Sequence, residues 1–133
     1  MVAAPPGAYN RNMFVILEHT NADGVHWDFI VQIPGCELLP TWRLAHNPLL
    51  AQGNIPAQRI ADHPRHFLEY EGQLREGRGH VWRVERGKVI VEQYDIHGIV
   101  ARLAGGSLIG LYHIHPDEHG DTVFSSDSEN SIK

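Results

Sequence analysis

The stretch FVILEHTNADGVHWDFIVQI, residues 14–33, decides the fold of this protein. It holds two runs of β-branched and aromatic residues, separated by the short connection NADG, whose residues favour turns. This pattern predicts two strands joined by a hairpin. Because side chains alternate along a strand, we expect His26 and Asp28 to share one face, while Trp27 and Phe29 anchor the opposite face in the core.

His19 ends the first of these strands, so a hairpin returns it beside His26. Two imidazoles and one carboxylate form a ligand set that suits Mn²⁺, Fe²⁺ or Zn²⁺, with coordination positions left for water or substrate. The sequence therefore predicts a metal centre made of His19, His26 and Asp28. The alternative interpretation is a hydrogen-bonded pair of His26 and Asp28 on a solvated face, with His19 in a loop, because His-X-Asp alone is a weak motif.

Short apolar runs of the same kind recur along the chain between Gly, Pro and Asn residues; they include TWRL, HFLEYEG, HVWRVERG, KVIVEQY, IVARL and SLIGLYHIH. Their spacing predicts an all-β protein, a compact β-barrel of about eight short strands with minor helical turns. Arg86 and Gly87 lie between two alternating runs and predict a tight hairpin. Residues 55–61 are compatible with a helical turn.

The chain has 133 residues, enough for one domain with a core of its own. Residues 1–12 are small and polar with prolines, and the chain from residue 116 onward is acidic and rich in serine. We therefore expect flexible tails at residues 1–12 and 116–133, on either side of a β-barrel domain at residues 13–115.

The composition limits the classes of function. The formal net charge of −5 argues against a protein that coats nucleic acid, but it is compatible with binding a nucleic-acid end or a small phosphoester. The single cysteine, Cys36, excludes an internal disulfide and a Cys-based zinc cluster, whereas ten histidines favour His and carboxylate ligation of a metal. No apolar run approaches the ~20 residues that span a bilayer, and the first residues lack the apolar stretch of a signal peptide. We expect a cytoplasmic protein with no membrane partner.

Five segments resemble, in the same order, the 3′-phosphoesterase module of bacterial DNA ligase D. FVILEHTNADGVHWDFIVQI is similar to that family's F-V-[IV]-x-x-H, short loop, H-[YW]-D-F-R-L-E, and TWRLAHNP is similar to its S-W-A-V-P-K-G-P. ADHPRHFLEYEG is similar to E-D-H-P-x-x-Y-x-x-F-E-G, LREGRGHVWRVERG to I-P-E-G-x-Y-G-x-G-x-V-x-x-W-D-x-G, and SLIGLYHIH to L-x-G-x-[WFY]-x-L-[VI]. The resemblance covers residues 13–115. It implies a compact β-barrel and a Mn²⁺-dependent enzyme that removes 3′-phosphates and 3′-terminal ribonucleotides from DNA ends and leaves a 3′-hydroxyl.

The resemblance also implies roles for single residues. His19, His26 and Asp28 fall on the family's metal ligands, which places His26 in the catalytic centre, and His63 falls on its phosphate-contacting histidine. An imidazole at this position can supply a hydrogen bond or a proton to a phosphoryl group during hydrolysis. The alternative for His63 is a turn histidine before a proline.

Three positions depart from the family pattern. The family's Arg two residues after the metal-binding Asp is Ile30, its phosphate-facing Lys is His46, and its Tyr after the D-H-P motif is Phe67. We expect Ile30 to face the substrate and to weaken phosphate binding, because it lacks a guanidinium. The candidate phosphate-binding residues are His46, Arg59 and Arg43. The alternative for both arginines is that they are surface cations.

These observations favour a weakly active, Mn²⁺-dependent 3′-phosphoesterase, whose substrate is a DNA 3′ end or another phosphoester and whose partner is a separate ligase or polymerase. A first alternative keeps the fold without the chemistry, as a module that binds a phosphate or a nucleic-acid end. A second is a non-haem iron oxygenase, because two histidines and a carboxylate also form the facial triad of those enzymes. The order of the ligands argues against it, since their remaining histidine usually lies far downstream whereas His19 lies upstream.

His113 and His115 repeat the spacing that puts two side chains on one face of a strand, with His119 nearby. No carboxylate lies between them, and they correspond to no functional position of the family. We therefore interpret them as surface residues rather than as a second metal site.

Overall fold

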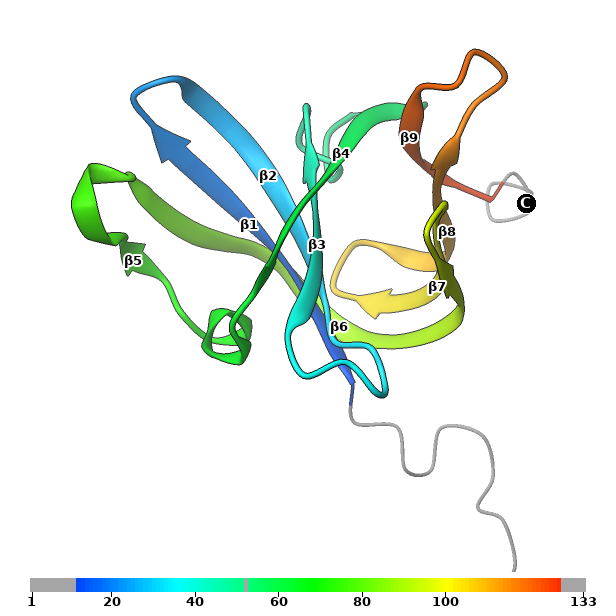
Figure 1. The fold of residues 1–133 in the computed structure, drawn as a ribbon, viewed down its shortest axis with the longest axis horizontal. Coiled ribbons are helices and arrows are strands. Elements are labelled where there is room, and N and C mark those ends of the chain that lie inside the picture. The colour runs from blue at the N-terminus through cyan, green and yellow to red at the C-terminus, as the bar shows by residue number, and fades with distance from the viewer. Residues whose placement is uncertain (1–11, 52, 128–133) are drawn as a thin grey trace, which may run out of the picture.

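The computed structural model describes residues 12–51 and 53–127, and within them the chain is almost entirely β-structure (Figure 1). Nine strands form one antiparallel sheet, and the only helices in the described part are two short 3₁₀ turns. The all-β prediction is confirmed. No helix among the described residues is long and apolar enough to cross a membrane.

The elements follow one another closely along the chain. In order they are β1 (Met13–Asn21), β2 (Gly24–Val31), β3 (Leu39–Leu44), β4 (Ile55–His63), η1 (Arg65–Leu68), β5 (Gly72–Gln73), η2 (Arg75–Gly77), β6 (His80–Asp95), β7 (Gly98–Gly105), β8 (Ile109–Pro116) and β9 (Thr122–Ser126).

Eight of the strands close in a barrel-like ring. The sheet order is β1-β2-β3-β4-β9-β8-β7-β6-β5, and the additional pairing of β1 with β6 joins the two sides of the ring, leaving β5 outside it. In Figure 1 the end of the β1–β2 hairpin and β5 lie on the left, and β8 and β9 lie on the right. Closure leaves few unpaired strand edges, which limits association through exposed backbone groups.

Two apolar clusters are separated by the alternation of side chains along the strands. Phe14 and Ile16 of β1 belong to the first cluster, to which each strand of the ring contributes and which fills its interior. Val15 and Leu17 of the same strand point the other way, into a second cluster. Aromatic and aliphatic side chains from η1 and the segment around β5 cover this second cluster: Phe67, Leu68, Tyr70 and Leu74.

Two local predictions from the sequence are wrong. The chain does not turn at Arg86 and Gly87, because β6 continues through them and pairs with β1 along its first half and with β7 along its second. Gly87 is needed for close approach instead: a Cβ there would lie 2.2 Å from the carbonyl oxygen of Ala104. Residues 55–61 form part of β4 rather than a helical turn.

The expected C-terminal tail is also wrong in part. Thr122–Ser126 form β9, which pairs with β8 and, through Ile55 and Pro56, with β4. The side chain of Phe124 is buried in the ring. This strand therefore contributes to the core, although the neighbouring residues in the sequence are mostly polar. The domain therefore extends beyond residue 115. The expected N-terminal tail, except for Asn12, and residues 128–133 lie outside the described residues.

A buried carboxylate holds the turn between β7 and β8. Glu85, on β6, is 7% exposed and accepts hydrogen bonds from the backbone N–H groups of Gly106, Ser107 and Leu108 at 3.1, 2.7 and 2.7 Å. Charge-assisted bonds of this kind are about twice as strong as neutral ones. Glu85 thus fixes the path of the chain where β7 returns into β8.

Replacing Glu85 by alanine is expected to lower the free energy of unfolding by about 3 kcal/mol or more, because three backbone donors lose their acceptor together. Urea unfolding followed by tryptophan fluorescence measures the loss. Glu92→Ala is the matched control: Glu92 pairs with Arg102 on the surface, and its removal should cost less than about 1 kcal/mol. Equal effects of the two substitutions would contradict the role given to Glu85.

Candidate metal centre

The hairpin of β1 and β2 brings the predicted metal ligands together. His19 and His26 are direct cross-strand partners, and Asp28 lies two residues further along β2 on the same face as His26. The connection consists of Ala22 and Asp23, and the side chain of Asn21 accepts a hydrogen bond from the Asp23 N–H at 2.8 Å. The short polar connection therefore sets the register that places His19 beside His26.

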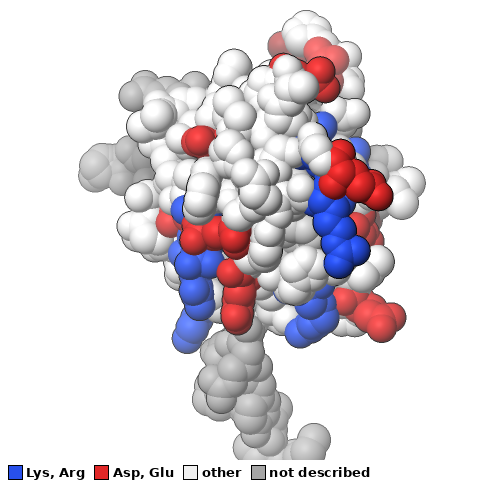
Figure 2. Space-filling model, turned by 90° about the vertical axis from the view of Figure 1, so that its left-hand side faces the viewer, with Lys and Arg blue, Asp and Glu red and all other residues white. Residues whose placement is uncertain are grey.

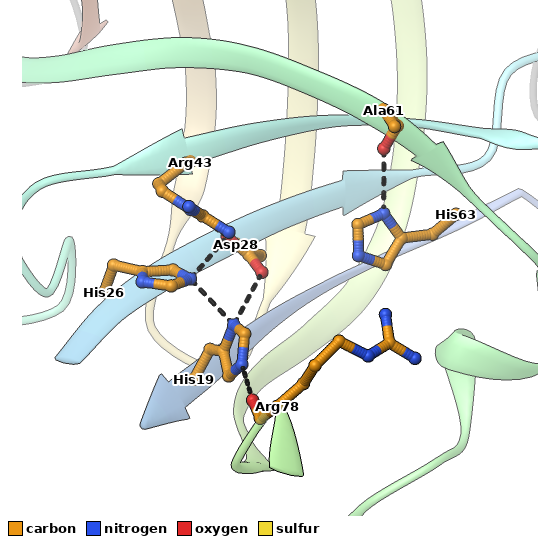
Figure 3. A network of polar contacts seen from close by, with 7 residues as sticks. All are labelled: His19, His26, Asp28, Arg43, Ala61, His63 and Arg78. Atoms are coloured by element: carbon orange, nitrogen blue, oxygen red, sulfur yellow. Dashed lines mark hydrogen bonds and ion pairs between the residues drawn. The ribbon is translucent and has the colours of Figure 1, made fainter. Parts of the chain in front are cut away.

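The three side chains present their ligand atoms to one another (Figure 3). His19 Nδ1 lies 2.8 Å from His26 Nε2 and 3.8 Å from Asp28 Oδ2, and His26 Nε2 lies 3.6 Å from Asp28 Oδ1. Candidate ligand atoms from all three residues lie within 4.8 Å of one another. Two atoms bound about 2.1 Å from one ion at a right angle lie roughly 3.0 Å apart, so these separations are those of a first coordination sphere.

A backbone carbonyl fixes the orientation of the His19 ring. The Nε2 atom of His19 lies 2.8 Å from the carbonyl oxygen of Arg78. That oxygen can only accept, so Nε2 carries the hydrogen and Nδ1 presents its lone pair to His26 and Asp28. Histidines that bind metals commonly donate their second N–H to a carbonyl or carboxylate in this way.

The carboxylate is buried without full compensation. Asp28 is 3% exposed, and its Oδ1 has no hydrogen-bond partner among the described residues. The nearest cationic atom is Nε of Arg43, at 3.5 Å, which likewise makes no hydrogen bond within the described part of the chain. A buried charged oxygen without a bond is costly unless a ligand satisfies it. The site therefore fits a divalent ion by its geometry and by the Asp28 oxygen that lacks a hydrogen bond among the described residues.

The cluster lies at the wall of a large cleft. The cleft has a volume of about 1210 Å³, and its lining includes His19, Asp28, Arg43, His63 and Arg78. His26 belongs to the metal cluster but is not among the residues that line the described cleft. Apolar residues of the second cluster and its cover form another part of the wall: Leu17, Phe67, Tyr70, Leu74 and Val81.

His63 reaches the cleft from the end of β4, and Figure 3 shows its ring turned toward the metal cluster. Its Nδ1 lies 3.1 Å from the carbonyl oxygen of Ala61, so Nδ1 carries the hydrogen and Nε2 remains available to the cleft. The ring of Phe67 packs edge-on against it, with 5.0 Å between centroids. Burial lowers the pKa of His63 below its usual value, with further lowering by Arg43 and His19, although the Asp28 charge acts in the opposite direction.

Of the three expected phosphate-binding residues, the described lining of the cleft contains only Arg43. Arg59 pairs with Trp42 across β3 and β4, and its guanidinium lies 5.0 Å from the Trp42 ring centroid and 2.6 Å from Asp62. It therefore projects from the face of the sheet opposite to Asp28. His46 is exposed beyond the end of β3, outside the described lining.

The expectation that Ile30 reaches the substrate is wrong. Ile30 shares the face of Asp28, but its side chain is fully buried in the second apolar cluster with Val15, Leu17 and Leu39. The residues that cover the second apolar cluster lie over this part of the sheet face. The Ile30 side chain therefore packs in the cluster and does not line the cleft. The presence of isoleucine where the family has arginine therefore does not indicate that phosphate binding is weakened by the loss of a direct contact.

Like Arg75, Arg78 is a cleft arginine that the sequence analysis missed. Figure 3 shows its side chain extending from the His19 end of the site toward His63. The backbone around it is constrained: Glu76 has φ 60°, and a Cβ on Gly79 would lie 1.8 Å from the carbonyl oxygen of Thr20. The sequence did contain a sign of this: Arg78 lies between two glycines. Glycines on both sides of one residue indicate a tight turn of the backbone that exposes the side chain between them.

Comparison with known proteins adds no relative to this description: no family model and no curated protein matches the chain.

Asp28→Asn is expected to weaken Mn²⁺ binding at least about a hundredfold, since loss even of an outer-shell partner costs about ten- to a hundredfold. Without metal, the free energy of unfolding should change by less than about 1 kcal/mol, because the substitution also neutralises a carboxylate that lacks full compensation. Calorimetric titration and urea unfolding in EDTA measure the two effects. The exposed Asp95→Asn serves as control, and Mn²⁺ affinity that survives in Asp28→Asn would show that the cluster is not the binding site.

Proposed function

We propose that the protein is a Mn²⁺-dependent phosphoesterase that removes a 3′-phosphate or a 3′-terminal ribonucleotide from DNA ends. The observation that carries the proposal is the His19, His26 and Asp28 cluster, whose buried Asp28 oxygen has no hydrogen-bond partner among the described residues, at the wall of a cleft that also contains His63 and three arginines. The barrel-like all-β fold agrees with the expectation drawn from the five similar segments.

His19, His26 and Asp28 would hold the ion, which when bound would polarise a phosphoryl oxygen as a Lewis acid. His63 is suited to handle the proton. Its lowered pKa keeps the ring neutral near pH 7, and its Nδ1–H bond to Ala61 leaves Nε2 as the basic atom facing the cleft. It accepts the proton of the attacking water as the new P–O bond forms. The bond from phosphorus to the sugar oxygen breaks, that oxygen leaves as a hydroxyl by taking a proton from a water molecule, and His63 releases its own proton to solvent.

Arg78, Arg75 and Arg43 supply positive charge to the cleft. A guanidinium can grip two phosphoryl oxygens at once, which a lone imidazole cannot do. Arg43 is already drawn toward Asp28, at 3.5 Å, whereas the Nε atom of Arg78 donates to the carbonyl oxygen of Arg75, at 3.2 Å, and its guanidinium extends toward His63 (Figure 3). We assign the main phosphate contact to Arg78, in place of the expected Arg59 and His46.

The distribution of surface charge favours binding to a DNA end over binding along a duplex. Figure 2, which faces the side of β5 and the β1–β2 hairpin, shows basic and acidic side chains interspersed rather than a continuous basic track. Binding along a duplex depends on many phosphate contacts made by such a track. A cleft of about 1210 Å³ has room for one terminal nucleotide with its phosphate. The 3′-hydroxyl that remains is the group that a separate ligase or polymerase uses.

The direct test is incubation of the protein with a labelled primer–template that ends in a 3′-phosphate or in one 3′-ribonucleotide. We expect a 3′-hydroxyl product with Mn²⁺ and none with EDTA. His63→Gln should lower kcat about 10²- to 10⁴-fold while leaving metal affinity unchanged, as loss of a general base does. Binding of the DNA end without turnover would indicate the non-catalytic module instead, and copurified iron with oxygen uptake would indicate an oxygenase.

Arg78→Met should lower kcat/KM on the 3′-phosphate substrate about ten- to a hundredfold, because a charged hydrogen bond to phosphate contributes about 1.5–3 kcal/mol. The carbonyl that holds His19 belongs to the backbone and is retained, so Mn²⁺ affinity should not change. Arg102→Met, an exposed arginine on β7, is the matched control. Full activity of Arg78→Met would remove this side chain from phosphate binding and leave the role to Arg43 or Arg75.

A further inference from the structure

Arg43 lies beside the carboxylate of the metal centre. Among the described residues it is the only arginine or lysine that forms an ion pair with Asp28, and its Nε lies 3.5 Å from Asp28 Oδ1. The two residues are direct cross-strand partners on β3 and β2, so their side chains leave the sheet on the same face. Figure 3 shows the Arg43 side chain reaching toward Asp28. Arg43 is therefore the counter-ion of this buried carboxylate.

The ion pair between Arg43 and Asp28 lacks a hydrogen bond. Neither Arg43 Nε nor Asp28 Oδ1 has a hydrogen-bond partner among the described residues. A guanidinium that binds a carboxylate firmly makes two parallel N–H···O bonds of about 2.7–2.9 Å, and the separation here is longer. The charges attract each other, but the geometry does not fix the guanidinium in place. A ligand that binds the Asp28 oxygen directly can therefore displace Arg43.

An ion at the cluster and the Arg43 guanidinium depend on the same negative charge. Asp28 Oδ1 lies 3.6 Å from His26 Nε2, within the cluster, and 3.5 Å from Arg43 Nε. A cation within about 4–6 Å of an aspartate lowers the affinity of the carboxylate for a proton about 10- to 1000-fold. A metal ion is a positive ligand of the same carboxylate, so the neighbouring guanidinium disfavours its binding for the same electrostatic reason. Arg43 thus weakens metal binding as long as it remains beside Asp28.

The cleft offers the Arg43 guanidinium a second position. Both Asp28 and Arg43 line the cleft, but the Arg43 side chain is 38% exposed whereas that of Asp28 is 4% exposed. An arginine stem has several rotatable bonds, so the guanidinium can turn from Asp28 into the cleft while β3 remains in place. Arg75 and Arg78 line the same cleft but form no ion pair with Asp28 within the described chain. Of these three arginines, Arg43 alone contacts both the metal centre and the space in which an anion would bind.

We propose that Arg43 couples metal binding to anion binding. It is the counter-ion of Asp28 until an ion occupies the cluster, and its guanidinium then turns into the cleft and donates to the phosphate group of the substrate. An anion that draws Arg43 away from Asp28 strengthens metal binding in return, because such coupling is reciprocal. The protein therefore holds its ion tightly only together with a phosphate-bearing ligand. This inference rests on the proposed function, since it assigns a role to Arg43 at the same site.

Calorimetric titration of the metal-free full chain with Mn²⁺, with and without inorganic phosphate, tests the coupling. We expect phosphate to tighten Mn²⁺ binding by wild type. Without phosphate, Arg43→Met should bind Mn²⁺ about tenfold more tightly than wild type, because the competing cation is gone. The factor by which phosphate tightens Mn²⁺ binding should fall at least about fivefold in this variant. Arg43→Lys retains the positive charge and should return both values toward those of wild type.

Arg75→Met is the matched control, since it removes a guanidinium from the same cleft and leaves the ion pair of Arg43 with Asp28 intact. Its Mn²⁺ affinity without phosphate should equal that of wild type. Equal or weaker Mn²⁺ binding by Arg43→Met in the absence of phosphate, or an undiminished effect of phosphate in that variant, would overturn the proposal. Circular dichroism should confirm that each variant is folded, which the partly exposed position of the Arg43 side chain favours.

These binding measurements do not depend on turnover, so they separate the coupling from the proposed activity. Coupling through Arg43 in a protein that does not cleave the labelled primer–template would retain this role and reject the phosphoesterase. Cleavage of the primer–template, combined with either overturning result at Arg43, would do the reverse.

Discussion

The register of the β1–β2 hairpin is the constraint on which the rest of the structure depends. It pairs His19 with His26 and, through the same alternation, places Phe14 and Phe29 inside the ring. A slip of one residue would turn every side chain of one strand to the other face. The core residues would then leave the ring at the same time as the metal ligands separated. Burial of the aromatic side chains therefore supplies the energy that holds the ligand geometry.

The metal cluster is an exception to the packing rules that govern the rest of the chain. Asp28 is nearly as buried as the core residues beside it, yet one of its oxygens has no hydrogen-bond partner among the described residues. Glu85 is the informative contrast, because it is similarly buried but accepts three backbone hydrogen bonds beyond its own strand. A carboxylate that serves structure is satisfied by the protein, whereas one that serves binding is left for a ligand to satisfy. The difference between these two acids argues for function at Asp28.

The sequence predicted what depends on alternation within one hairpin and missed what depends on distant pairing. The joint position of His19, His26 and Asp28 followed from strand parity and a short turn. The alternation of side chains along β2 correctly put Ile30 on the face of Asp28, but it could not predict that residues from η1 and the segment around β5 bury this side chain. For Arg59, no local pattern indicated that β4 would pair with β3 so that this residue lies beside Trp42. The continuity of β6 through Gly87 and the pairing of β9 likewise rest on contacts between distant segments.

The same spacing of two residues on a strand has opposite surroundings at the two histidine groups. His26 and Asp28 lie where the sheet extends past the ring and is roofed by η1, β5 and η2, which creates a cleft with arginines and an apolar wall. His113 and His115 lie on the uncovered side of the ring, in a shallow depression beside Asp127. A covered site excludes water and strengthens electrostatic effects on a bound ion or substrate, whereas an open depression leaves its side chains in contact with solvent. The surroundings of the first group therefore suit ligand binding better than those of the second.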